Sequence, residues 1–208
     1  MPLKFANNQS LTATTALPSA VPTDNLILIS TQTASNSANI SFTTGLNGTY
    51  DVYEFKFINI HPSAEAYLTF NGSTNGGSSY GVTNTITTFS AYHNESDTAT
   101  AVQYQGSNDN AQSTNNIILT DSINSFSPND GNAGGTLQLF NPSSTTYVKH
   151  FMSNTQTYYS ITGNLDYSIN WYTAGYFNTT SAINAIRFQM SSGNIDDGII
   201  KLYGVKKS

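Results

Sequence analysis

Residues 50–60, YDVYEFKFINI, carry the pattern that decides the fold. Tyr53, Phe55 and Phe57 alternate with charged residues, so one side of the segment is aromatic and the other is charged. Because successive side chains of a β-strand point to opposite faces, this period of two predicts a strand with one buried face. Such half-buried strands are typical of antiparallel sheets.

The same period of two continues along most of the chain. In residues 165–174, LDYSINWYTA, Ile169 and Trp171 alternate with polar residues, and no segment shows an apolar stripe at helical spacing. About a dozen short strands, separated by Gly, Asn, Ser and Asp clusters, predict an all-β fold, a jelly-roll-like antiparallel β-sandwich. The other strands are expected near residues 26–31, 38–43, 66–71, 84–92, 101–105, 116–120, 136–140, 146–152, 157–162, 186–190 and 200–204.

The chain divides into an arm and one main domain. Residues 1–24 show neither period and contain three prolines, which predicts an extended N-terminal arm, with a disordered leader as the alternative. Residues 25–208 are expected to form the β-sandwich domain, in which the polar, glycine-rich residues 106–135 are a variable loop excursion containing one strand. The arm carries spaced apolar side chains that we expect to dock on a sister subunit or another protein: Leu3, Phe5, Leu11, Leu17 and Val21.

The composition favours self-association and argues against several other classes. Charged residues make up 9% of the chain, against about 25% in ordinary globular domains, so large interfaces can be buried without desolvating many ions. A net charge of −5 with Arg187 as the single arginine argues against nucleic acid partners. The lack of cysteine excludes disulfides and thiolate sites. No apolar run approaches the roughly 20 residues of a membrane helix, and the N-terminus lacks the pattern of a signal peptide.

Several motifs could carry chemistry, and each has a structural interpretation that we prefer. Residues 77–81 match the G-x-S-x-G pattern of a serine hydrolase elbow, but no helix is predicted after them, so a hairpin loop is favoured. Asp196 and Asp197, in NIDDG, are interpreted as the turn of a hairpin before the last strand rather than a metal or acid pair. His150 is expected in the core or at an interface, and His93 is a weaker metal or acid–base alternative. We therefore predict no catalytic, cofactor-binding or metal-binding residue.

A glycan-binding role stays open because the chain holds 13 tyrosines and one tryptophan. Aromatic faces can stack on pyranose rings. Aromatic residues on strands more often fill cores and subunit interfaces, so packing is the preferred interpretation. Five aromatic residues that look exposed form the candidate glycan platform: Tyr158, Tyr159, Tyr172, Tyr176 and Phe177.

Four long segments carry a resemblance to a known family: residues 25–63, 75–96, 140–152 and 175–206. The most specific part is SSGNIDDGIIKLYG at the end of the last segment. Together they resemble a widespread group of virion structural proteins of tailed bacteriophages, many of them marine. The resemblance extends over roughly residues 24 to 206 and departs mainly in the loop excursion.

The resemblance implies a non-enzymatic β-sandwich building block of the virus particle, with no catalytic residues. We therefore expect a virion protein, either a capsid decoration or head fibre or a tail-attached protein, that forms a homo-oligomer, with a trimer as the expected state. It is expected to dock on other virion proteins and to use no cofactor, no nucleic acid and no membrane insertion. A glycan-binding receptor-recognition domain of a tail fibre, with a host surface glycan as partner, is the alternative.

Overall fold

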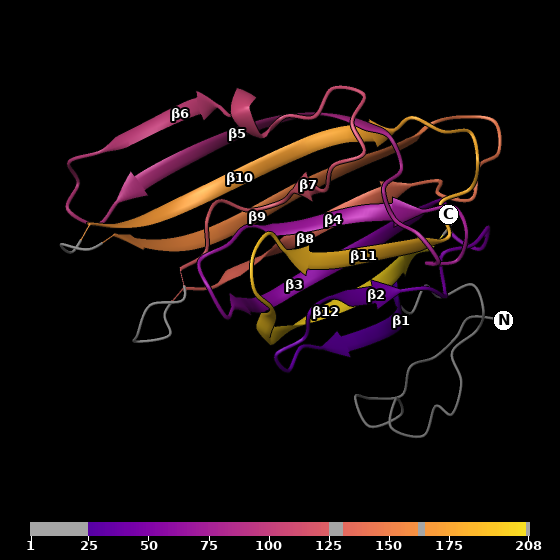
Figure 1. The fold of residues 1–208 in the computed structure, drawn as a ribbon, viewed down its shortest axis with the longest axis horizontal. Coiled ribbons are helices and arrows are strands. Elements are labelled where there is room, and N and C mark those ends of the chain that lie inside the picture. Colours follow the sequence, from indigo (N-terminus) through magenta and orange to yellow (C-terminus); the bar gives the residue numbers. More distant parts are fainter. Residues whose placement is uncertain (1–24, 125–130, 162–164, 207–208) are drawn as a thin grey trace, which may run out of the picture.

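Two antiparallel sheets of unequal width pack as a sandwich in the computed structural model, which describes residues 25–124, 131–161 and 165–206 (Figure 1). The wide sheet has the strand order β1 (Leu26–Thr33), β12 (Ile195–Val205), β3 (Val52–Pro62), β8 (Ala133–Phe140), β9 (Lys149–Ile161), β10 (Leu165–Phe177), β5 (Asn84–Asn94) and β6 (Thr100–Tyr104). The narrow sheet has the order β2 (Ile40–Phe42), β11 (Ala185–Met190), β4 (Leu68–Ser73) and β7 (Ile117–Ile118). A short 3₁₀ helix, η2 (Gly106–Asn108), follows β6. The predicted all-β sandwich is confirmed.

The strand order separates an eight-strand sandwich from an added part. The chain crosses between the sheets at eight connections: β1 to β2, β2 to β3, β3 to β4, β4 to β5, β6 to β7, β7 to β8, β10 to β11 and β11 to β12. This alternation of two four-stranded layers is compatible with a jelly roll. Two further strand pairs, β5 with β6 and β9 with β10, add the strands β9, β10, β5 and β6 to one side of the wide sheet. We call these four strands the sheet extension.

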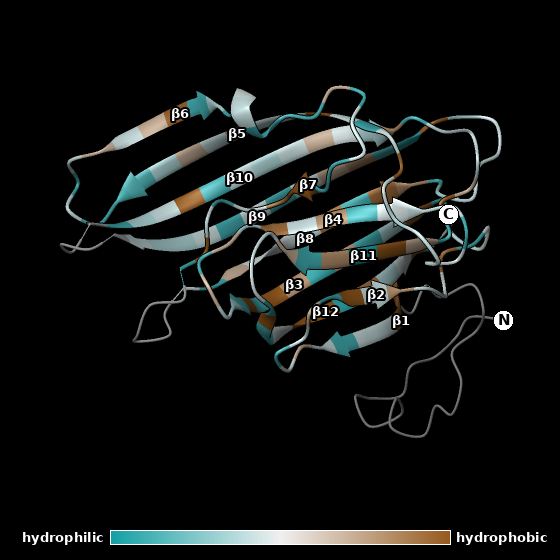
Figure 2. Ribbon diagram, viewed as in Figure 1, coloured by the Kyte–Doolittle hydropathy of each residue, from teal (hydrophilic) through white to brown (hydrophobic). Residues whose placement is uncertain are grey.

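The core between the sheets is aromatic. The ring of Phe188 on β11 lies 5.1 Å from Phe55 and 5.3 Å from Phe57, both on β3, and 6.2 Å from Phe42 on β2, measured between centroids. Tyr53, Phe55 and Phe57 are at most 4% exposed, which confirms the buried face predicted for residues 50–60. Figure 2 shows hydrophobic residues concentrated on β2, β3, β11 and β12, whereas the strands of the extension are largely hydrophilic.

Hydroxyl groups line the inner side of the extension, the side that continues the core face. The buried Ser and Thr side chains there, which we call the hydroxyl layer and which lie among buried apolar residues such as Trp171, are Thr88, Ser90, Ser153, Thr155, Thr157 and Thr173. Residues 105–120 lie against them: Thr173 donates to the carbonyl of Ile118 (2.9 Å), and Ser90 accepts from the side chain of Gln105 (2.8 Å). Neighbouring amides continue this polar packing, since Asn110 donates to Asn84 (2.8 Å). Much of the loop excursion is therefore a packed cover, and β7 is the strand predicted inside it.

The structure differs from two of the predicted element boundaries. The prediction of two separate strands at residues 146–152 and 157–162 is wrong, because β9 runs unbroken from Lys149 to Ile161. The Ser, Asn, Thr and Gln residues between them resemble a turn in sequence, but their inward members belong to the hydroxyl layer. The loop excursion is also shorter than predicted, because β8 already begins at Ala133. The arm at residues 1–24, with its candidate docking side chains, lies outside the described residues.

Candidate functional site

The outer face of the sheet extension, which points away from the hydroxyl layer, exposes large apolar side chains. Phe89 is 43% exposed, Val102 76%, Tyr104 66% and Met152 57%. The register brings the aromatic ones together, because Phe89 on β5 is paired with Tyr104 on β6 and with Tyr172 on β10. The rings of Phe89 and Tyr172 stack at 4.7 Å with planes 12° apart. Tyr104, Phe89 and Tyr172 therefore form an aromatic row across β6, β5 and β10.

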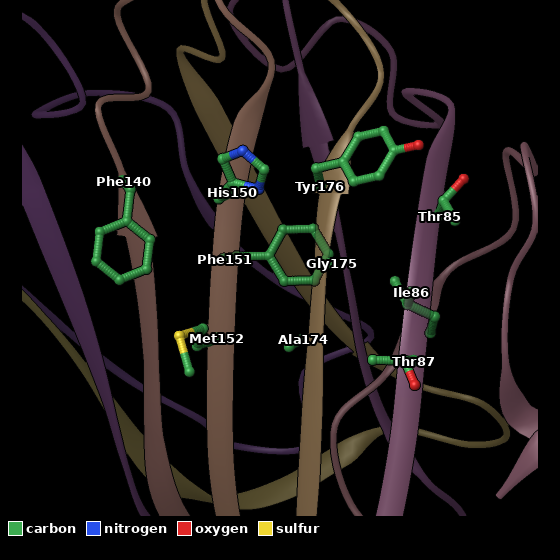
Figure 3. Close-up of a pocket in the computed structure, with 10 residues that line it drawn as sticks. All are labelled: Thr85, Ile86, Thr87, Phe140, His150, Phe151, Met152, Ala174, Gly175 and Tyr176. Atoms are coloured by element: carbon green, nitrogen blue, oxygen red, sulfur yellow. The ribbon is translucent and has the colours of Figure 1, made fainter.

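An apolar hollow of about 500 Å³ lies beside this row (Figure 3). The small residues Ala174 and Gly175 of β10 leave space at its centre, and Met152 lies on the neighbouring strand β9. His150 and Tyr176 stand at one end, with ring centroids 6.0 Å apart. Glycine is required at position 175, because a Cβ there would lie 2.3 Å from a backbone carbonyl oxygen of β5.

The central part of the outer face, on β5, β9 and β10, is almost without charge. The outward positions within residues 85–91 of β5, 150–158 of β9 and 168–176 of β10 hold no Asp, Glu, Lys or Arg, and His150 is the one histidine among them. Burying charged groups against a partner is costly unless each finds a counter-ion. This face can therefore be covered by a partner without leaving unpaired ions, which is a property of interface cores.

The five residues of the candidate glycan platform do not form one site. Tyr158, Tyr172 and Tyr176 occupy outward positions on β9 and β10. Tyr159 points to the inner side and lines a different cleft. Phe177 is 0% exposed and packs in the core 5.9 Å from Phe70, so its prediction as an exposed residue is wrong. The glycine before Tyr176 does not end the strand, and the inward parity of Trp171 continues to Phe177.

Asp196 and Asp197 do not form the turn of a hairpin. β11 and β12 belong to different sheets, so residues 191–194 connect the two layers, and both aspartates already lie in β12. Asp197 Oδ1 accepts a hydrogen bond from the amide of Gly198 (2.7 Å), and Asp196 Oδ2 lies 3.7 Å from Nδ1 of His61. In the described part of the chain, no group of three or more His, Asp and Glu side chains could hold a metal ion.

The other motifs are also placed by the structure. Residues 77–81 lie in the connection from β4 in the narrow sheet to β5 in the wide sheet, so they are not a hairpin loop, and a strand rather than a helix follows them. His150 is exposed on the outer face, so a core position for it is wrong. His93 contacts Asp97 (Nε2 to Oδ1, 3.0 Å) at the exposed end of β5. Neither histidine has a serine hydroxyl or a second carboxylate as a hydrogen-bond partner within residues 25–124, 131–161 and 165–206.

No family model, curated protein or solved structure matches this chain. Within the described ranges, the structure holds no helix with the length and apolar character needed to cross a membrane.

Proposed function

We propose that this protein is a non-enzymatic structural component of a tailed-bacteriophage virion that assembles with copies of itself and with other virion proteins. The observation that carries the proposal is the outer face of the sheet extension, which exposes large apolar side chains among neutral polar ones and carries few charged groups. Exposed side chains such as Val102 and Met152 share this face with the hollow above Ala174 and Gly175. A surface that holds both projections and a hollow can be complementary to a second copy of itself.

The fold and the resemblance support the same class of protein. Jelly-roll sandwiches recur in viral capsid domains and in lectins, although a fold by itself does not establish a function. The resemblance of residues 191–204 to virion structural proteins favours the first of these two groups. In this chain those residues form the connection into β12 and most of that strand, which pairs with β1 and β3 inside the wide sheet.

The association is tested by light scattering after size exclusion. The protein is expected to form a closed homo-oligomer, a trimer, at micromolar concentration, and the double variant Met152→Glu/Val102→Glu is expected to be monomeric. Gln189→Glu is the matched control, because residue 189 occupies a partly exposed position on the narrow sheet. A monomeric wild-type protein, or equal dissociation in the control, would contradict the proposed interface.

The virion assignment needs its own measurement. Gradient-purified particles of the phage that encodes the chain should yield its peptides by mass spectrometry in stoichiometric amount. Recovery only from the unassembled fraction of the lysate would contradict a structural role in the particle, whatever the oligomeric state of the isolated protein.

A further inference from the structure

A second cleft, of about 360 Å³, lies on the inner side of the extension. Strands β9, β10, β5 and β6 supply part of its lining, and residues 65–67 and 121–122 supply the rest. These residues lie before β4 and after β7, where β4 and β7 are neighbours in the narrow sheet. We call it the tyrosine cleft. It is separate from the outer face, so the two surfaces can be tested independently.

Four half-buried tyrosines line this cleft. Tyr159 on β9 is paired in register with Tyr167 on β10, and the ring of Tyr167 lies 5.8 Å from that of Tyr92 on β5, with planes 72° apart. Tyr67 joins them from the end of the loop before β4. None of the four phenol groups makes a hydrogen bond to another described residue. The cleft therefore offers aromatic rings together with hydroxyl groups that have no hydrogen-bond partner among the described residues.

The carboxylates of Glu65 and Asp121 also line the tyrosine cleft. Ser122 connects them: its hydroxyl donates to Oε1 of Glu65 (3.0 Å), and its amide donates to Oδ1 of Asp121 (2.7 Å). Each carboxylate keeps a second oxygen that can accept a hydrogen bond, and neither forms an ion pair with a Lys, Arg or His among the described residues. Gln103 on β6 adds a side-chain amide to the lining.

Burial and nearby carboxylates raise the pKa of two of the cleft tyrosines, Tyr67 and Tyr159. Burial raises the pKa of Tyr67, and the nearby charges of Asp121 and Glu65 raise it further. The pKa of Tyr159 is raised in the same way, by burial first and then by the same carboxylates. Burial also raises the pKa of Asp121, against the effect of the Ser122 amide. At neutral pH Tyr67 and Tyr159 therefore remain hydrogen-bond donors as well as aromatic surfaces.

We infer that the tyrosine cleft binds a neutral saccharide. Aromatic rings bury the apolar C–H faces of a pyranose, while carboxylate and amide groups bind its hydroxyls, so a saccharide uses both kinds of group. The unpaired charges of Glu65 and Asp121 disfavour a sialylated, sulfated or phosphorylated sugar by like-charge repulsion. Three of the four rings lie in a row across adjacent strands, which suits an extended sugar chain better than a compact organic cation.

Ligand-observed NMR and calorimetry on the full-length protein can test this. The probes are maltotriose, cellotriose and chitotriose as neutral saccharides, 3′-sialyllactose as the anionic one and choline chloride as the organic cation. At least one neutral saccharide is expected to bind, and Tyr167→Ala is expected to weaken it by about tenfold or more, as truncation of a central aromatic contact does. Tyr172→Ala is the matched control, since it removes the same side chain from the same strand on the opposite face.

Several outcomes would overturn the inference that the tyrosine cleft binds a neutral saccharide. Binding of choline alone would identify an aromatic cation site, and comparable binding of 3′-sialyllactose would show that the carboxylates do not face the ligand. Loss of saccharide binding in Tyr172→Ala but not in Tyr167→Ala would move the site to the outer face. Tyr167→Phe keeps the ring, so it should retain most of the affinity and the wild-type melting temperature, and a full loss of binding in that folded variant would contradict ring stacking. Failure of all neutral probes would refute saccharide binding while leaving the assembly proposal untouched.

Discussion

Truncation of Phe89 should weaken self-association without unfolding the protein. Its side chain is 43% exposed, and because an aromatic side chain offers about 200 Å², roughly 90 Å² is available for burial against a partner. At about 25 cal/mol per Å² this contributes about 2 kcal/mol per copy, which corresponds to a factor of about 30 in the dissociation constant. Phe89→Ala should show this loss in sedimentation equilibrium. The free energy of unfolding of this variant should fall by at most about 3 kcal/mol, because the other roughly 110 Å² of the side chain, including the face stacked on Tyr172, is already buried within the monomer.

Leu28→Ala is the control for this experiment. Leu28 is 53% exposed on β1, at the opposite edge of the wide sheet from β6, so it removes similar exposed apolar surface far from the extension. Its oligomer should dissociate at the wild-type concentration. If Phe89→Ala and Leu28→Ala weaken association equally, the effect comes from general surface hydrophobicity and the reasoning about the extension is refuted.

Three other substitutions test the fold. Phe188→Ala should cost about 3–5 kcal/mol in urea unfolding because it empties the centre of the aromatic core, and Phe188→Leu should cost clearly less. Replacing Asp196 and Asp197 together by Asn should change the free energy of unfolding by about 1 kcal/mol or less. A chelator should leave the melting temperature of the wild type unchanged. A larger loss of stability in either test would reveal a metal or acid site. Lys149 is fully buried with its ammonium donating to two backbone carbonyls, and burial lowers its pKa. Between that lowered pKa and the ordinary value of about 10.4, the unfolded chain therefore binds more protons than the native protein. The stability of the wild type relative to Lys149→Met should consequently rise with pH across this window. A stability difference that is independent of pH would contradict the lowered pKa.

The sequence predicted the elements that obey one simple rule. The alternation of Tyr53, Phe55 and Phe57 follows directly from burial of one strand face, and the same rule placed Trp171. The rule failed where glycine or polar residues continue a strand. Gly175 lies within β10 because a neighbouring strand approaches it closely, and the polar segment within β9 is held by hydrogen bonds to residues far away in sequence. Neither cause is visible in a local pattern.

The candidate sites were harder to predict because they depend on how many strands the wide sheet contains and on the order of those strands. Val102 and Met152 resemble ordinary core residues in sequence, and only the strand order shows that the extension leaves their face open. The tyrosine cleft combines side chains from six separate segments, and of its tyrosines only Tyr159 was among the predicted platform residues. Pairing of strands distant in the chain decides which tyrosines meet. Composition indicated many aromatic residues and little charge, and it could not indicate their grouping.

The hydroxyl layer makes the two halves of the molecule respond differently to cold. Attraction between apolar groups weakens on cooling because their hydration has a large heat capacity, and the aromatic core depends on this attraction. Exposure of polar groups changes the heat capacity in the opposite sense, and hydrogen bonds such as that from Thr173 to the carbonyl of Ile118 do not depend on the same effect. The region that the hydroxyl layer fills should therefore lose less stability on cooling than the aromatic core between the sheets does.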